Sequence, residues 1–205
     1  SFLSVSTNEV LIYAAEPEGS VIAYEQTTTN SHLWLPSLDV NPNLSNKGNS
    51  GIGSTANPLQ GRIERSTVGG TNIYTLFNAN GTKRTFVERA YPIGVNFTRQ
   101  RPYLTQWEDH RGNFYTFDYG EDATKPDYGE VRRIQSSNGS FLGFYYDVYG
   151  RIIEAYTGDG RRLSYEYDKF GDLVSVIHPD ASQINYTYQH ATMVTNSVTN
   201  VYSLH

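Results

Sequence analysis

The sequence Tyr146-Asp147-Val148-Tyr149-Gly150-Arg151-Ile152 starts again, with changes, at Tyr167-Asp168-Lys169-Phe170-Gly171-Asp172-Leu173. A third, degraded copy begins at Tyr188, so both steps (146 to 167 and 167 to 188) span 21 residues. A fixed period of about 20–50 residues decides the architecture before any single motif does. We therefore predict a repeat array, and we look for function in the surface that such an array makes.

Equivalent positions of the copies alternate between large apolar and polar residues with a period of two, which predicts strands. Three apolar columns recur after successive turns: Tyr115, Leu142, Leu163 and Ile184; Phe117, Phe144, Tyr165 and Tyr186; and Tyr119, Tyr146, Tyr167 and Tyr188. The turns between the strands are expected at Asn80-Gly81, Arg111-Gly112, Asn138-Gly139, Asp159-Gly160 and Asp180-Ala181. Asn80-Gly81 in particular is typical of a two-residue type I′ turn.

The predicted fold is therefore all-β, with consecutive β-hairpins of about 21 residues stacked into a curling, spiralling antiparallel sheet. We expect three parts. Residues 1–60 are an N-terminal β segment with an Asn-, Pro-, Gly- and Ser-rich connection, 61–128 are irregular, decorated hairpins, and 129–205 are regular repeats. The connection over 36–61 is expected to lie packed on the surface, with a binding loop as the alternative.

The amino-acid composition argues against several classes of function and site. The net charge of −5 argues against a nucleic-acid partner, which selects for a basic face. The chain has no Cys, so disulfides and thiolate metal sites are excluded. No apolar run approaches the roughly 20 residues of a membrane span. The sequence starts at Ser1 without an initiator Met or a signal peptide, so we expect it to be a piece of a larger protein.

These copies resemble the YD, or RHS, repeat, whose pattern is Tyr-Asp-x-x-Gly-Arg-Ile followed by Asp-Gly and Tyr-x-Tyr-Asp. Tyr146–Ile152 and Tyr167–Leu173 match it closely, and Asp109–Phe117 resembles half of a unit. The resemblance implies a spiralling β-sheet shell. In bacterial polymorphic toxins and insecticidal toxin complexes such a shell encloses a C-terminal payload; in teneurins it belongs to an extracellular adhesion module for which carbohydrate binding has been proposed. This chain has about five units, and neither a self-cleaving segment nor a payload is recognised in it.

Turn chemistry explains the motif without a ligand. Glycine takes positive φ without strain, the Asp side chain bonds backbone N–H groups two residues on, and Tyr packs on the neighbouring strand while its hydroxyl reaches water or a carbonyl. We therefore assign structural roles to the residues of the motif: Tyr146, Asp147, Gly150, Arg151, Asp159, Gly160, Tyr165, Tyr167, Asp168, Gly171, Tyr186 and Tyr188.

No catalytic residue, metal site or cofactor is predicted. Glu108-Asp109-His110 pairs carboxylates with an imidazole, but it falls on an expected turn. A second set of residues, of which Arg151 also belongs to the motif, could bind a ligand: Trp34, Trp107, Tyr149, Tyr156, Arg151 and Arg161. The arginines on adjoining hairpins (Arg132, Arg133, Arg151, Arg161 and Arg162) are expected to pair with glutamates across strands, with an acidic-glycan site as the alternative.

The sequence thus predicts a non-catalytic structural module, part of the encapsulating or scaffold region of a large secreted or cell-surface bacterial RHS/YD-repeat protein. The alternative is a carbohydrate- or protein-binding adhesion module that uses exposed aromatics and arginines. Expected partners are the rest of the parent protein, or further copies joined through open sheet edges. Glycans or a cell-surface protein are the other candidate partners; nucleic acid and a membrane span are not expected.

Overall fold

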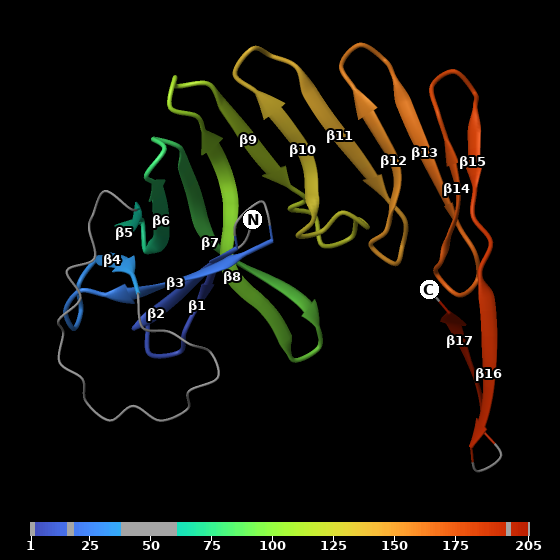
Figure 1. Ribbon diagram of the computed structural model, residues 1–205, viewed down its shortest axis with the longest axis horizontal. Coiled ribbons are helices and arrows are strands. Elements are labelled where there is room, and N and C mark those ends of the chain that lie inside the picture. The colour runs from blue at the N-terminus through green and yellow to red at the C-terminus, as the bar shows by residue number, and fades with distance from the viewer. Residues whose placement is uncertain (1–2, 16–18, 38–60, 196–197, 205) are drawn as a thin grey trace. The chain divides into compact units, whose positions relative to one another are not determined.

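The computed structural model describes residues 3–15, 19–37, 61–195 and 198–204, and these form strands and turns without a helix (Figure 1). Strand order in the sheet follows chain order from β1 to β15, as expected for consecutive hairpins. The predicted all-β class and the array of antiparallel hairpins are confirmed. The connection expected over 36–61, packed on the surface or alternatively a binding loop, falls largely on 38–60, which lies outside the described residues.

Contacts divide the chain into two units, residues 1–117 and 118–205. In the first unit each strand pairs antiparallel with its predecessor. Its strands are β1 (Leu3–Val5), β2 (Leu11–Ala15), β3 (Val21–Gln26), β4 (Leu33–Pro36), β5 (Gly61–Val68), β6 (Thr71–Asn78), β7 (Lys83–Gly94), β8 (Phe97–Glu108) and β9 (Phe114–Tyr119), the last of which crosses the boundary.

The core of the first unit is drawn from strands far apart in the sequence. Alternation in β2 buries Ile12 and Ala14, and Trp34 of β4 and Phe86 of β7 are also fully buried. β1 contributes Leu3 to the same cluster and lies against β8. The sheet of this unit therefore folds back on itself, so that its first strand meets its later strands. Burial of such side chains stabilises the fold by roughly 1.5–3 kcal/mol each.

The hairpin of β7 and β8 is longer than its neighbours. Pairing of β7 with β6 ends at Val87, and pairing of β8 with β9 starts at Gln106, so residues 88–102 form a two-stranded arm. Figure 1 shows this arm as the green hairpin that extends beyond the adjoining strands. It corresponds to the irregular decoration that the sequence predicts in this part of the chain.

The second unit contains the regular repeats. Its strands are β10 (Val131–Ser136), β11 (Phe141–Tyr146), β12 (Ile152–Thr157), β13 (Arg162–Tyr167), β14 (Leu173–Ile177), β15 (Gln183–Asn185), β16 (Gln189–Thr195) and β17 (Val198–Leu204). β10 to β15 pair in succession, whereas β16 and β17 pair with each other as a separate two-stranded sheet. The repeat thus adds strands to the main sheet as far as β15.

A β-bulge recurs with the repeat. Tyr145 pairs with Glu154 but Tyr146 pairs with Ile152, which leaves Ile153 as the extra residue. One period later Tyr167 pairs with Leu173, which leaves Val174 extra. Bulges bend the strand and increase its right-handed twist. Each repeat therefore carries its own bend, placed where the motif tyrosine ends a strand.

The turns differ from the type I′ prediction. At Asn78–Thr82 the amide of Gly81 donates to Asn78 O (3.0 Å) and the amide of Asn78 donates to Thr82 O (2.9 Å). Gly81 has φ 82°, whereas Asn80 is not in the positive-φ region. This is a type I turn closed by a left-handed glycine, the three-residue hairpin loop. Asn80 fits it because its side-chain oxygen accepts the Thr82 amide (3.0 Å).

Ala181 occupies the same left-handed position in the last regular turn, with φ 64°. We expect Ala181→Gly to raise the free energy of unfolding by about 0.5–1 kcal/mol, because an L-residue is strained there and glycine is not. The matched change Gly160→Ala, one repeat earlier, should lower it by about 1 kcal/mol. A Cβ at Gly160 meets no atom within 4 Å, so only backbone strain is tested. Urea unfolding of both variants checks this; two unchanged midpoints would contradict it.

Candidate functional site

The aspartate of the motif locks the turn that joins two repeats. Asp147 Oδ1 accepts the amides of Tyr149 (2.9 Å) and Arg151 (3.0 Å), and Oδ2 accepts Arg151 Nε (2.8 Å). Partial desolvation opposes ionisation, but these hydrogen bonds from Arg151 and Tyr149 outweigh it and lower the pKa of the Asp147 carboxyl. Both carboxylate oxygens are thus engaged within the turn.

The same lock appears in the neighbouring copies. Asp168 Oδ1 accepts the amides of Phe170 (2.8 Å) and Asp172 (3.0 Å). Asp109 accepts the amides of Arg111 (2.8 Å) and Asn113 (2.9 Å), and a hydrogen bond from the Asn113 side chain is the first cause of its lowered pKa. Asp109 and His110 therefore lie in a turn, as predicted, whereas Glu108 ends β8 and pairs with Lys83 (2.8 Å).

Tyrosine hydroxyls close the open end of each regular hairpin. Tyr146 Oη donates to Val131 O (2.6 Å), Tyr167 Oη to Ile152 O (2.8 Å) and Tyr188 Oη to Leu173 O (2.8 Å). Each bond spans 15 residues and ends on the residue that begins a strand. We call this series the tyrosine ladder. The sequence predicts that these hydroxyls reach water or a carbonyl; the structure assigns the carbonyl.

The motif arginine also joins two repeats. Arg151 forms an ion pair with Asp147 (Nη2 to Oδ2, 2.6 Å), and its guanidinium lies 4.5 Å from the centre of the Tyr167 ring in the next copy. A cation over an aromatic face contributes about 0.5–1 kcal/mol at an exposed site. Arg151, which is both a motif residue and a candidate ligand-binding residue, is therefore engaged in the structural contacts.

The strand register shows which residues of the second unit share each of the two predicted faces of the sheet. Phe144 lies opposite Ala155, which lies opposite Leu163, and these share the apolar face. Gly143 lies opposite Tyr156, which lies opposite Arg162, on the other face. Leu142 is 37% exposed and Ile184 46% exposed, so the apolar face is only half covered in this chain.

Residues 146–183 match the family model described as RHS Repeat. The chain contains RHS repeats. No curated protein matches the chain. The match spans the two best copies of the motif and the whole of β12 to β14, the segment in which the aspartate lock, the tyrosine ladder and the bulge all recur. The repeat model thus coincides with the most regular hydrogen bonding in the structure.

The six candidate ligand-binding residues do not form one site around the RHS repeats. Trp34 has no exposed surface, and its indole Nε1 donates to Glu9 O (3.0 Å), so its ring is a core element. Trp107 is half-buried in β8. Tyr149 is 80% exposed beside Arg151 (5.0 Å). Arg161 pairs with Asp159 (2.9 Å) in the turn that follows β12.

Tyr156 belongs to an aromatic cluster on the polar face that the sequence columns do not predict. Its ring is stacked on Tyr145 (5.0 Å, 19°) and stands edge-on to Phe141 (5.9 Å). Gly143 makes room for it, because a Cβ there would come within 2.4 Å of the Tyr156 ring. Arg133 covers Phe141 at 3.9 Å, and the cluster is completed on β13 by Arg162, which pairs with Glu154. Glycine opposite an aromatic residue is the only sequence signal for this arrangement.

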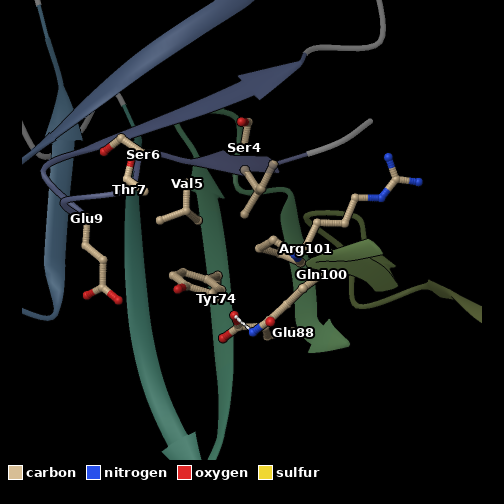
Figure 2. Close-up of a pocket in the computed structure, with 11 residues that line it drawn as sticks. Ser4, Val5, Ser6, Thr7, Glu9, Tyr74, Glu88, Gln100 and Arg101 are labelled. Atoms are coloured by element: carbon tan, nitrogen blue, oxygen red, sulfur yellow. Dashed lines mark hydrogen bonds between the residues drawn. The ribbon is translucent and has the colours of Figure 1, made fainter. Parts of the chain in front are cut away.

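The first unit contains a crevice of about 620 Å³ between the β1 segment and strands β6 to β8 (Figure 2). Tyr74 lies at its base, where burial raises the pKa of the phenol and a hydrogen bond with Arg65 opposes the rise. Among the described residues no three His, Asp or Glu side chains cluster as metal ligands. No helix suited to span a membrane occurs in that part of the chain either.

We expect Tyr146→Phe to lower the free energy of unfolding by about 1 kcal/mol, because the ring stays packed while Val131 O loses its donor. Tyr167→Phe should have a similar effect. Tyr149→Phe is the matched control, since its side chain is exposed and should leave stability within about 0.3 kcal/mol of the parent. Chemical unfolding of the three variants measures this. Equal stability of all three would show that the tyrosine ladder contributes nothing.

Alkaline pH should weaken the second unit through Tyr146. Burial, and then the carboxylates of Glu130 and Asp127, raise the pKa of Tyr146 to about 12, against about 10 in an unfolded chain. The native state then holds this proton more tightly, so the stabilisation is complete below about pH 10 and is lost as the pH rises towards 12. Allowing for the partial exposure of the ring, the loss is on the order of 1 kcal/mol. Unfolding at graded pH should show this loss in the parent relative to Tyr146→Phe; parallel pH profiles would refute it.

Proposed function

We propose that this chain is a structural wall segment: a non-catalytic part of the encapsulating or scaffold region of a large RHS-repeat protein. The observation that carries the proposal is the set of hydrogen bonds that the repeated polar side chains form. Asp147 and Asp168 accept the amides of their own turns, and the tyrosine ladder bonds the backbone of the neighbouring strand in the same hairpin. Side chains committed in this way build a sheet and leave no acid, base or nucleophile of the motif for chemistry.

The direction of these bonds supports a wall rather than a compact site. Each hydroxyl of the tyrosine ladder closes its own hairpin, and Arg151 links the Asp147 turn at the end of one hairpin to the Tyr167 ring of the next. Strand pairing between β11 and β12 and between β13 and β14 joins the successive hairpins, so stability spreads along the array as a sum of neighbour contacts. A sheet of this kind can extend by adding copies, whereas a catalytic centre needs groups that converge on one point.

The half-covered apolar face fits a wall that encloses something. Side chains such as Leu142, Ile184 and Tyr186 leave this face partly exposed here. Exposed apolar patches mark surfaces that meet another chain or a further layer of the same protein. In the proposed parent this face meets enclosed polypeptide, and the protein is secreted or displayed at the cell surface of a bacterium, in keeping with its RHS repeats.

The proposal predicts that intact repeats withhold neighbouring chain from proteases. In the parent protein, we expect trypsin to cut the region that follows the repeats at least about tenfold faster when Tyr146→Phe and Tyr167→Phe are combined, because the wall then opens more often. Quantitative digestion followed by mass spectrometry measures the rates. Tyr149→Phe is the control and should match the native rate.

Equal cleavage in all forms, with the repeats still folded by circular dichroism, would overturn encapsulation. The alternative function, an adhesion module, rests on the aromatic cluster, in which Tyr145 is 51% exposed. Titration of the chain with neutral and acidic oligosaccharides at millimolar concentration tests it on the same material. Binding that Tyr145→Ser abolishes would support adhesion in place of a purely structural role.

A further inference from the structure

β1 has a hydrogen-bonded neighbour on one side only, because it stands first in the sheet and pairs with β2. The amide of Ser6 donates to Leu11 O at 2.9 Å, which makes these two a hydrogen-bonded pair. In an antiparallel ladder such pairs alternate with pairs whose polar groups face away. The N–H and C=O of Val5 therefore point to the other edge of β1, where the described residues provide no partner strand.

The crevice of about 620 Å³ runs along this edge. Its wall includes every residue from Leu3 to Thr7, although side chains on a strand alternate in direction. A cavity that touches all three residues of β1 and the two that follow it lies beside the backbone. The facing wall is made by Tyr74, Glu88 and the β8 segment Gln100–Pro102 (Figure 2).

Glu88 gives the crevice a negative charge. Its carboxylate accepts hydrogen bonds from the amides of Asn72 (2.8 Å) and Gln100 (2.9 Å), and within the described part of the chain no cation forms an ion pair with it. Figure 2 shows Gln100 directed at Glu88 while the guanidinium of Arg101 is turned away. Glu9, by contrast, is paired with Arg65 at 2.5 Å. A half-buried carboxylate without a cation favours a basic ligand group.

We propose that the crevice takes up an extended polypeptide segment, which adds as a strand to the unpaired edge of β1 and places a lysine or arginine side chain against Glu88. Only another backbone supplies donors and acceptors at the repeat of a strand edge. Alternate side chains of the added strand would lie beside Leu3 and Val5, which face the core, so the segment alternates apolar and polar residues with a basic residue among the inward positions.

The proposal does not depend on the encapsulating role, because it concerns the first unit and the regular repeats lie in the second. Open sheet edges are expected to bind further polypeptide, and the proposal identifies β1 as the edge that does so. Edge strands are templates for such pairing unless they are blocked, and β1 carries neither proline nor a charged residue between Leu3 and Val5 to block it.

The probe is a fluorescent seven-residue peptide with valine at its second and sixth positions, lysine at the fourth and threonine elsewhere. Fluorescence anisotropy with the full chain should show saturable binding. Val5→Pro removes the outward N–H but no bond to β2, and it should weaken binding about tenfold or more. Val5→Thr keeps the N–H and the branched shape and should bind within about twofold of the parent. Glu88→Gln should weaken binding about three- to tenfold.

Methylation of the peptide amides separates backbone pairing from general adhesion. Methylating one alternate set of nitrogens should abolish binding, and methylating the other set should not, because only one set faces β1. Failure of the lysine peptide to bind, or equal binding to the parent and to folded Val5→Pro, would overturn the proposal. Dimerisation of the chain that Val5→Pro abolishes, without peptide binding, would assign the edge to a second copy and refute the peptide site.

Discussion

The structure depends on one recurring hydrogen bond, from a tyrosine hydroxyl at the end of a hairpin to the carbonyl of the residue that begins the same hairpin. A two-stranded hairpin is marginal alone in water, because it buries too little apolar surface to offset the entropy of ordering it. The bonds of Tyr146, Tyr167 and Tyr188 hold the two ends of each hairpin together through a hydroxyl that is half-buried. The ring supplies the packing and the hydroxyl supplies the register, so one residue type explains why tyrosine recurs at this position.

The aspartate lock and the bulge work with the tyrosine ladder. Asp147 holds the turn by its amides, which fixes where the next strand starts, and the extra residue Ile153 shifts the following register by one. Tyr146 then stands opposite Ile152, the residue that in turn receives the hydroxyl of Tyr167. A change at any of these positions alters the partners of the others, which is the physical reason that the motif repeats as a block.

Much of this could be predicted from the sequence, because the regular repeats are held by local rules. Apolar residues at alternate positions predict strands, glycine after Asp predicts turns, and the fixed spacing predicts that the hairpins are equivalent. The type I turns, the bulges and the carbonyl groups that accept the tyrosine hydroxyls could not be predicted from the sequence, because they depend on backbone geometry. In the first unit the burial of Trp34 and the contact of β1 with β8 join residues that are far apart in sequence, and no local pattern reports such contacts.

The polar groups of the two units also differ in the partners that they have. In the regular repeats the motif tyrosines and aspartates find hydrogen-bond partners at fixed spacings, and Arg151 meets both Asp147 and Tyr167. In the first unit the outward N–H and C=O of Val5 on β1 have no partner strand among the described residues, and the nearby Glu88 accepts amides of Asn72 and Gln100 but has no cation partner there. An open strand edge and a half-buried carboxylate without a cation are both completed by a polypeptide that carries a basic residue. The β1 edge beside Glu88 is therefore better suited to recognition of a basic polypeptide than the Asp147 and Tyr146 side chains of the regular repeats, which are already hydrogen-bonded within the sheet.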